Sequence, residues 1–237
     1  MSETTKSDIH NRFEIDSGKM IVIPPIIDDM FKPVESGIAK NFREKYRLPD
    51  HYWLYVAHYY PHKNHERLFQ AYAILRTRQK TTWPLVLCGM KNGADKVIAE
   101  KLHAAGIENN VMWLPKLDDS EMPTLYSAAS ALVFPSLYEG GGIPIMEALA
   151  CGCPVVASDI PTTKEFAGNS TVICFDGENI EDMVKAMLQF ANDDVLLDYK
   201  LRGLEKAKTY RKDSIIPRLL NAYKIACQGD AMNKFMG

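Results

Sequence analysis

The chain has 237 residues, of which 46% are hydrophobic and 24% are charged, and its formal net charge is −2. This composition is typical of a globular protein, and Lys+Arg 28 against Asp+Glu 30 gives no basic excess for nucleic acid or an anionic membrane. There is no apolar run of transmembrane length, the start MSETTKSD does not resemble a signal peptide, and five cysteines, an odd number, indicate a reduced protein. We therefore expect a cytoplasmic location.

Short apolar strands alternate with helices along most of the chain. An approach segment, 1–20, precedes an expected short strand at Ile21–Ile23 and a helix at Ser36–Tyr46. Further strands are expected at Trp53–Ala57, Leu85–Cys88, Val111–Leu114, Ala131–Phe134, Val155–Ala157 and Thr171–Cys174. Helices are expected at 64–77, 94–105, 118–129 with Asp118, Asp119 and Ser120 as caps, from Ile143, and at 180–190, 195–208 and 214–226 with Pro217 in its first turn.

Continuous apolar strands that alternate with helices are typical of a parallel sheet covered on both faces. The sequence therefore predicts a doubly wound, Rossmann-like α/β domain. Such sheets bind ligands at the carboxyl ends of their strands, where His58, Pro115 and Glu139 fall.

The stretch from Phe134 to Pro154, FPSLYEGGGIPIMEALACGCP, carries the clearest functional signal. It places a strand, a loop with Glu139 and three glycines, and a helix containing Glu147 in succession. Free N–H groups at a helix N-terminus attract anions, but two carboxylates would repel a phosphate. Carboxylates beside free amides suit a polyhydroxylated ligand, because hydroxyl groups can both donate and accept hydrogen bonds. The structural alternative is a glycine-rich turn with solvated glutamates.

This stretch resembles the E-x7-E segment of the family-four retaining GT-B glycosyltransferases, also called glycosyl transferases group 1. The match runs from Pro135 to Ala157, and Gly141 replaces a phenylalanine that is usual in the family. The resemblance covers nearly the whole chain but only about half of a two-domain enzyme, the C-terminal half of the GT-B fold. It implies an interdomain segment at 1–33, a nucleotide-sugar-binding domain at 34–208, and a crossover helix with a tail at 209–237.

The resemblance also implies roles for individual residues. Lys63, in AHYYPHKN, matches the lysine that contacts the donor diphosphate, and His58 stands where many members have an arginine. Glu147 would accept hydrogen bonds from the ribose, and Glu139 would contact the donor sugar near its reacting carbon. Glu139 and Lys63 are therefore the expected catalytic residues. The remaining contacts would be with the base, from Pro115, Lys116 and Leu117, and with sugar hydroxyls or phosphate oxygens, from the amides of Gly141, Gly142 and Ile143.

Several of these residues also have a structural interpretation. Lys63 alone would be a solvated lysine before a helix, and Glu147 a glutamate that stabilises a helix N-terminus. His58, His62 and His65 could suggest a metal, but no carboxylate pattern completes the set, so we expect no metal and no cofactor. Glu165 matches a recurrent glutamate of the family, for which we expect a structural role at the start of a helix.

The implied reaction is metal-independent transfer of a hexose from a nucleotide sugar to a hydroxyl acceptor, as in polysaccharide biosynthesis. The acceptor would bind an N-terminal domain or a separate subunit. The alternative is a non-catalytic nucleotide-sugar-binding module or the partner subunit of a split glycosyltransferase, while the E-x7-E match disfavours an epimerase or a phosphorylase. Apolar residues surround much of the helix at 214–226, so we expect self-association or binding to an N-terminal-type domain. We expect no nucleic-acid partner, and membrane contact only through a partner or the acceptor.

Overall fold

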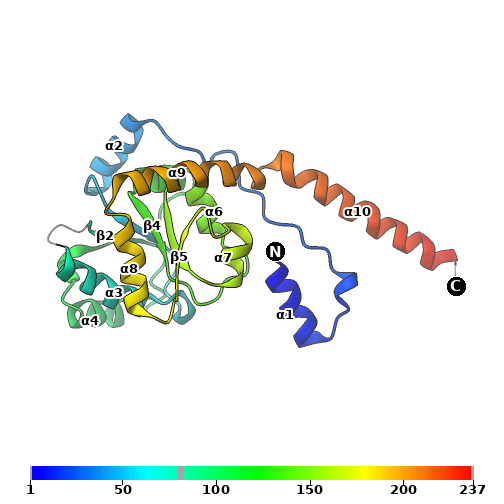
Figure 1. The fold of residues 1–237 in the computed structure, drawn as a ribbon, viewed down its shortest axis with the longest axis horizontal. Helices are drawn as coiled ribbons and strands as arrows, with labels where there is room; N and C mark the ends of the chain where they lie inside the picture. The colour runs from blue at the N-terminus through cyan, green and yellow to red at the C-terminus, as the bar shows by residue number, and fades with distance from the viewer. Residues whose placement is uncertain (1, 80–82, 236–237) are drawn as a thin grey trace.

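The structure is a computed structural model that describes residues 2–79 and 83–235, with side chains described as far as 227 (Figure 1). Six parallel strands form one sheet in the order β3-β2-β1-β4-β5-β6. The chain starts in the middle of the sheet at β1, builds outward to β3, and then returns to add β4 on the other side. This doubly wound order confirms the predicted fold class. The strands are β1 (Trp53–Val56), β2 (Leu85–Cys88), β3 (Val111–Leu114), β4 (Ala131–Phe134), β5 (Val155–Ser158) and β6 (Ile173–Phe175).

The central strands are apolar at almost every position because neither face of the sheet meets water, and the polar exception in β5, Ser158, is also buried. All four residues of β2, β4 and β5 are buried. In β1, Trp53 pairs with Leu85 of β2 on one side and with Ala131 of β4 on the other, so the first residues of the three strands are in register. Their carboxyl ends consequently meet at one edge of the sheet.

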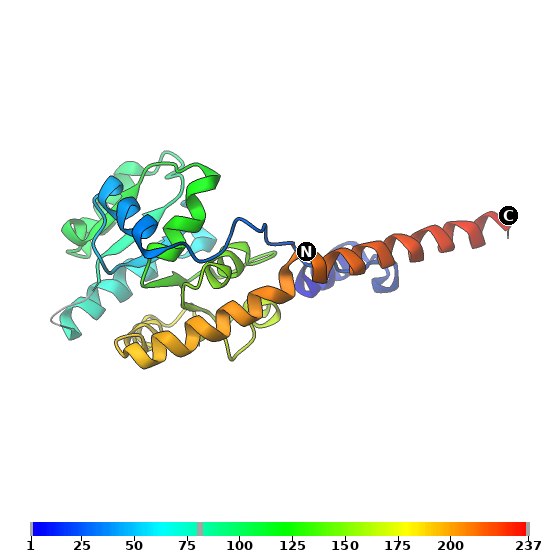
Figure 2. The same cartoon turned by 90° about the horizontal axis from the view of Figure 1, so that it is seen from above.

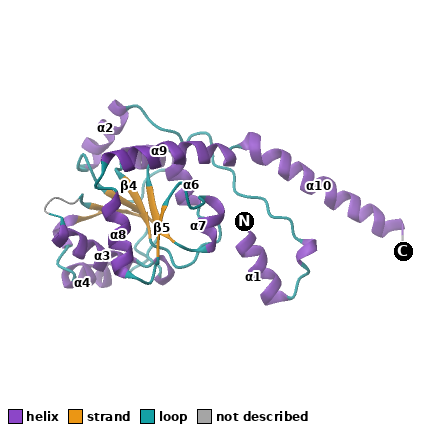
Figure 3. Cartoon of the chain, viewed as in Figure 1, coloured by secondary structure: helices purple, strands orange, loops and turns teal. Residues whose placement is uncertain are grey.

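Helices form a layer on each face of the sheet (Figure 3). In one layer α3 packs against α4 and α8, and in the other α6 packs against α5 and α9, with α2 beside α5. Right-handed crossovers between parallel strands produce this division. The helices of the α/β body are α2 (Ser36–Tyr46), α3 (His65–Arg78), α4 (Asp95–Ala104), α5 (Met122–Ala128), α6 (Ile143–Ala150), α7 (Pro161–Phe166), α8 (Ile180–Gln189) and α9 (Asp193–Ala207).

The two terminal helices lie outside this body. The long helix α10 (Lys212–Phe235) extends away from it in both views (Figures 1 and 2), and its side chains Ile216, Leu220 and Tyr223 are 40%, 55% and 63% exposed. At the other end, α1 (Glu3–Phe13) begins beside α7, where the amide of Glu3 donates to both carboxylate oxygens of Glu165, at 2.9 and 3.0 Å. No helix of the described residues is long and apolar enough to cross a membrane.

The structure corrects five expectations from the sequence. Ile21–Ile23 is not a strand of the sheet, since Pro24 and Pro25 follow it and have no N–H to donate, and the approach segment contains α1. Glu165 lies in the last turn of α7, where it accepts from the amide of Glu3. The predicted caps Asp118, Asp119 and Ser120 make no side-chain cap, because a 3-10 turn at Asp119–Glu121 precedes the helix α5. The helix α10 begins before Ser214, so Pro217 lies inside it and not in its first turn.

Candidate functional site

A cavity of about 780 Å³ lies at the carboxyl ends of the strands. Its walls come from the loops after β1, β2 and β3, the first turns of α6, and the segment that precedes α2. Five of the predicted site residues line it: His58, Lys63, Lys116, Leu117 and Glu147. Sequence reasoning missed further lining residues, among them Met30, Met90, Asp119, Met122 and Pro144.

Lys63 and Glu139 meet where the loops after β1 and β4 approach each other. The ammonium of Lys63 lies 2.5 Å from Oε1 of Glu139, and the two side chains are 18% and 12% exposed. Glu139 itself does not line the cavity, so the structure places it behind Lys63. A partly desolvated ion pair of this kind fixes both side chains more firmly than a surface pair does.

The backbone of the β1 loop is held in place by contacts with the rest of the sheet edge. Lys63 ends a 3-10 turn at Pro61–Lys63, and its carbonyl accepts from the hydroxyl of Tyr55 at 2.5 Å. The buried amide nitrogen of Asn64 donates to the carbonyls of Pro135 and Gly177, at 3.0 and 2.8 Å. Asn64 therefore ties the loop after β1 to the loops after β4 and β6, and its side chain does not cap α3.

Glu147 reaches the cavity from α6. Its Oε2 accepts a hydrogen bond of 2.8 Å from the hydroxyl of Tyr126 in α5. Burial raises the pKa of Glu147 to about 7, and the negative charge of Asp119 acts in the same direction, while the bond from Tyr126 lowers it. A carboxylate that is only partly solvated and has one oxygen without a partner from the described chain is suited to accept hydrogen bonds from a ligand.

The glycine loop leads directly into α6. Gly142 has a φ of 55°, which glycine adopts without a Cβ penalty. Among the described residues none accepts a hydrogen bond from the amides of Gly141, Gly142 or Ile143. A Cβ on Gly141 would have its nearest neighbour at 3.9 Å, so the backbone here does not require glycine to avoid a clash at Cβ. These three residues do not line the cavity and lie beside it at the start of the helix.

His58 is held by the loop after β2. Its Nδ1 accepts a hydrogen bond from the amide of Met90 at 3.0 Å, so the hydrogen of the neutral ring lies on Nε2. The two loops approach closely at Gly89, where a Cβ would lie 2.1 Å from the carbonyl oxygen of Ala57. His58 therefore offers the cavity one N–H donor in place of an arginine.

The segment after β3 contributes Lys116 and Leu117, whereas the exposed Pro115 is not part of the cavity wall. Phe31, which the sequence placed only in the interdomain segment 1–33, also lines the cavity. Arg211 donates to the carbonyls of Asp28 and Phe31, at 2.6 and 2.5 Å. Arg211, the residue immediately before α10, thus fixes the backbone at Asp28 and Phe31, which forms part of the cavity wall.

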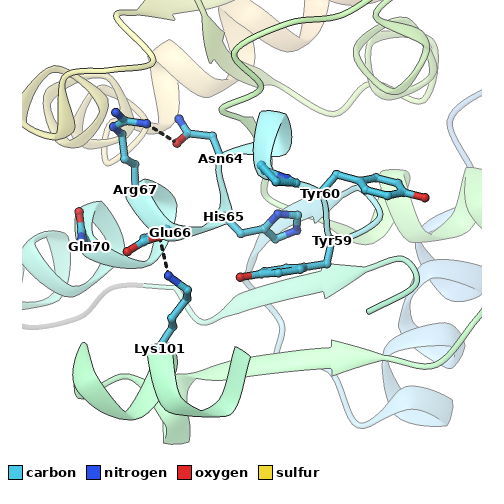
Figure 4. Close-up of a pocket in the computed structure, with 9 residues that line it drawn as sticks. Tyr59, Tyr60, Asn64, His65, Glu66, Arg67, Gln70 and Lys101 are labelled. Carbon is cyan, nitrogen blue, oxygen red and sulfur yellow. Dashed lines mark hydrogen bonds and ion pairs between the residues drawn. The ribbon is translucent and has the colours of Figure 1, made fainter. Parts of the chain in front are cut away.

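A second cavity, of about 460 Å³, lies beside the N-terminus of α3 (Figure 4). His65 lines it, with its ring parallel to that of Trp113 at a centroid distance of 5.8 Å and no hydrogen bond to either nitrogen. Burial lowers the pKa of His65 to about 4, so this ring is neutral and belongs to an aromatic cluster with Tyr55 and Tyr59. Within the described chain no group of three His, Cys, Asp or Glu side chains could hold a metal ion.

The chain resembles known proteins over most of its length. It is 29% identical over 227 residues to O-antigen chain mannosyltransferase B of Escherichia coli, an alignment that covers 95% of this chain and 59% of that protein. Sucrose-phosphate synthase of Thermosynechococcus elongatus superposes with a TM-score of 0.81 at 22% identity, covering 94% of this chain and 57% of that one. HepE of Anabaena, solved with UDP and glucose, gives a TM-score of 0.82 at 16% identity, with 94% and 61% covered.

This chain therefore spans less than two thirds of the length of these relatives. The structural likenesses, at identities below 25%, show a shared GT-B fold. The family model for glycosyl transferases group 1 matches residues 39–210, which include the six strands described here and all of the cavity wall except Met30 and Phe31. The protein belongs to the glycosyl transferases group 1 family.

Proposed function

We propose that this chain is the donor-binding half of a retaining glycosyltransferase that moves a hexose from a nucleoside diphosphate sugar to a hydroxyl acceptor. The observation that carries the proposal is the cavity at the carboxyl ends of the strands, where Lys63 and Glu147 face one space. One residue brings a positive charge and the other a carboxylate. A diphosphate and a ribose diol need these two groups at once.

The roles follow from the chemistry of each group. Lys63 and the amides of Gly141, Gly142 and Ile143 hold the diphosphate and stabilise its charge as it leaves, without a metal ion. His58 adds one neutral donor through Nε2, and Glu147 accepts from the ribose. The segment Pro115 to Leu117 borders the base. Glu139, which is held by Lys63, faces the sugar when the donor is bound.

The proposed division of the chain is an interdomain segment at 1–33, the nucleotide-sugar domain at 34–208, and a crossover helix with its tail at 209–237. The acceptor is bound by an N-terminal domain or by a separate subunit. The exposed apolar side chains of α10 support this, because such surface usually marks an interface. Mannose is the first hexose to test, since the Escherichia coli relative is named a mannosyltransferase, and UDP is a candidate nucleotide because HepE was solved with it.

A transfer assay tests this function. GDP-mannose, UDP-glucose and ADP-glucose are each incubated with the chain and a mixture of saccharides as hydroxyl acceptors, with and without the N-terminal half of the Escherichia coli relative. Release of nucleoside diphosphate and formation of the glycosylated acceptor are followed. We expect release from one donor, only when both halves are present. Binding of a donor without release in either condition would instead support a non-catalytic nucleotide-sugar module.

A further inference from the structure

Tyr126 and Glu147 form a buried pair at the edge of the cavity. The Tyr126 hydroxyl donates to Oε2 of Glu147 at 2.8 Å. In the described chain no other group donates to this carboxylate, so Oε1 is left for a ligand. Glu147 lines the cavity and Tyr126 does not, so the Tyr126 hydroxyl does not touch a ligand there and acts on one through the glutamate.

Tyr126 is rigidly placed. Its side chain is fully buried in α5, and its ring lies 6.3 Å from that of Phe31, which lines the same cavity. A buried tyrosine hydroxyl requires a hydrogen-bond partner, and here the partner is the Glu147 carboxylate. The fixed hydroxyl therefore fixes the orientation of the carboxylate.

The same hydrogen bond favours the charged form of Glu147. Burial and Asp119 raise the pKa of this carboxyl, and the donor hydroxyl of Tyr126 opposes them. An ionised carboxylate accepts hydrogen bonds from both hydroxyls of a vicinal diol, whereas a protonated carboxyl has lost part of its acceptor capacity. The other titratable groups that share the cavity with Glu147 are His58, Tyr60, His62, Lys63, Cys88, Lys116 and Asp119.

We infer that Tyr126 is a positioning residue that makes the cavity select nucleotides with an intact ribose diol over their 2′-deoxy counterparts. The inference rests on the proposed function, in which Glu147 accepts hydrogen bonds from the ribose. Tyr126 acts by orienting Glu147 and keeping it charged, and it does not touch the nucleotide.

The test compares the affinities of UDP and 2′-deoxy-UDP, and of GDP and 2′-deoxy-GDP, by calorimetric titration between pH 6 and pH 9. The ratio of the two affinities isolates the diol, because both members of a pair carry the same diphosphate. For the native chain we expect a preference for the ribonucleotide of at least about tenfold at pH 8, the size of one charge-assisted hydrogen bond. Tyr126→Phe should reduce the preference at pH 8 to about threefold or less. In this variant the preference should appear only at a higher pH than in the native chain, because Glu147 ionises at higher pH without the hydrogen bond from Tyr126.

Three further variants keep the result interpretable. Tyr46→Phe is the matched control, because the Tyr46 hydroxyl donates to Glu121 at 2.8 Å and neither residue lines the cavity. It should leave the preference unchanged. Glu147→Gln and the double variant Glu147→Gln with Tyr126→Phe should show the same reduced preference, since a residue that acts through Glu147 adds nothing once its charge is gone.

Three outcomes contradict the inference. Tyr126→Phe could keep the native preference and its pH dependence, it could weaken ribo- and deoxynucleotides equally, or the double variant could lose more preference than Glu147→Gln. In these cases the native chain still binds nucleotide, so the proposed function stands. If the native chain binds none of these four nucleotides but binds ADP, the same comparison is made with ADP and 2′-deoxy-ADP. If it binds no nucleoside diphosphate at all, the proposed function and the inference both fail.

Discussion

The ammonium of Lys63 lies 2.5 Å from Oε1 of Glu139, and this ion pair joins the loops after β1 and β4. These two strands are neighbours at the point where the order of the sheet reverses, which is where doubly wound folds bind their ligands. The two carboxylate positions of the family motif therefore differ in their surroundings: Glu147 lines the cavity, and Glu139 is paired with Lys63.

Lys63→Ala should weaken UDP or GDP binding about 10- to 100-fold, because a charge-assisted hydrogen bond is lost and Glu139 is left without its cation. Affinity for uridine or guanosine, which have no phosphate, should not change. Calorimetric titration measures both. Lys45→Ala is the control, since Lys45 forms a more exposed ion pair with Glu121 at 2.7 Å outside the cavity. An equal loss of nucleoside and diphosphate affinity would contradict the assigned role.

Glu139→Gln should separate binding from transfer. Removal of its charge releases Lys63 and reduces repulsion of the diphosphate, so affinity for UDP or GDP should be retained or increased. Transfer by the chain combined with an N-terminal half should fall on the order of 100-fold, a typical effect of losing one electrostatic contact to the transition state. Turnover equal to that of the native protein would show that Glu139 has no part in the reaction.

The raised pKa of Glu147 predicts a pH-dependent cost to stability. Its pKa is about 7 in the folded chain against 4.5 unperturbed, so folding favours the neutral carboxyl. The contribution of this group to the free energy of unfolding is fully present below pH 4.5 and is lost as the pH rises through 7. Glu147→Gln should therefore increase the free energy of unfolding at pH 8 by on the order of 2 kcal/mol and change it little near pH 4.5. Urea denaturation at both pH values measures this, and equal effects at both would mean that ionisation is not the cause.

The exposed apolar face of α10 predicts association. The chain should self-associate, or bind an N-terminal-type domain, through Leu220 and Tyr223. Leu220→Glu combined with Tyr223→Ser should abolish this in sedimentation velocity experiments over a range of concentrations. Leu201→Glu, at a 59% exposed leucine of α9, is the matched control and should have no effect. A native chain that stays monomeric and does not bind an N-terminal half would show that α10 does not mediate association.

Much of the fold follows from local sequence. The bounds expected for β2, β3 and β4 and for the helix Ser36–Tyr46 agree with the structure, because continuous apolar runs and turn residues mark these elements locally. The position of His58 at the sheet edge follows from the same reasoning, since it comes directly after a buried strand, whereas that of Lys63 follows from the family resemblance of its loop.

The spacing of residues along the sequence does not predict the side-chain contacts that shape the site. Tyr126 reads as a core residue at helical spacing, and nothing local shows that its hydroxyl reaches a carboxylate 21 residues later. Arg211 holds Phe31 across 180 residues of sequence. The ion pair between Lys63 and Glu139 likewise depends on the pairing of β1 with β4, which only the sheet order determines.

The central claim is that the cavity between the β1 loop and α6 binds a nucleoside diphosphate, and calorimetric titration of the chain with UDP, GDP and ADP tests it most directly. We expect one of the three to bind with a dissociation constant below about 1 mM, and its heat of binding to disappear in the double variant Lys63→Ala with Glu147→Ala. Absence of binding for all three nucleotides, or binding that survives in the double variant, would contradict the account.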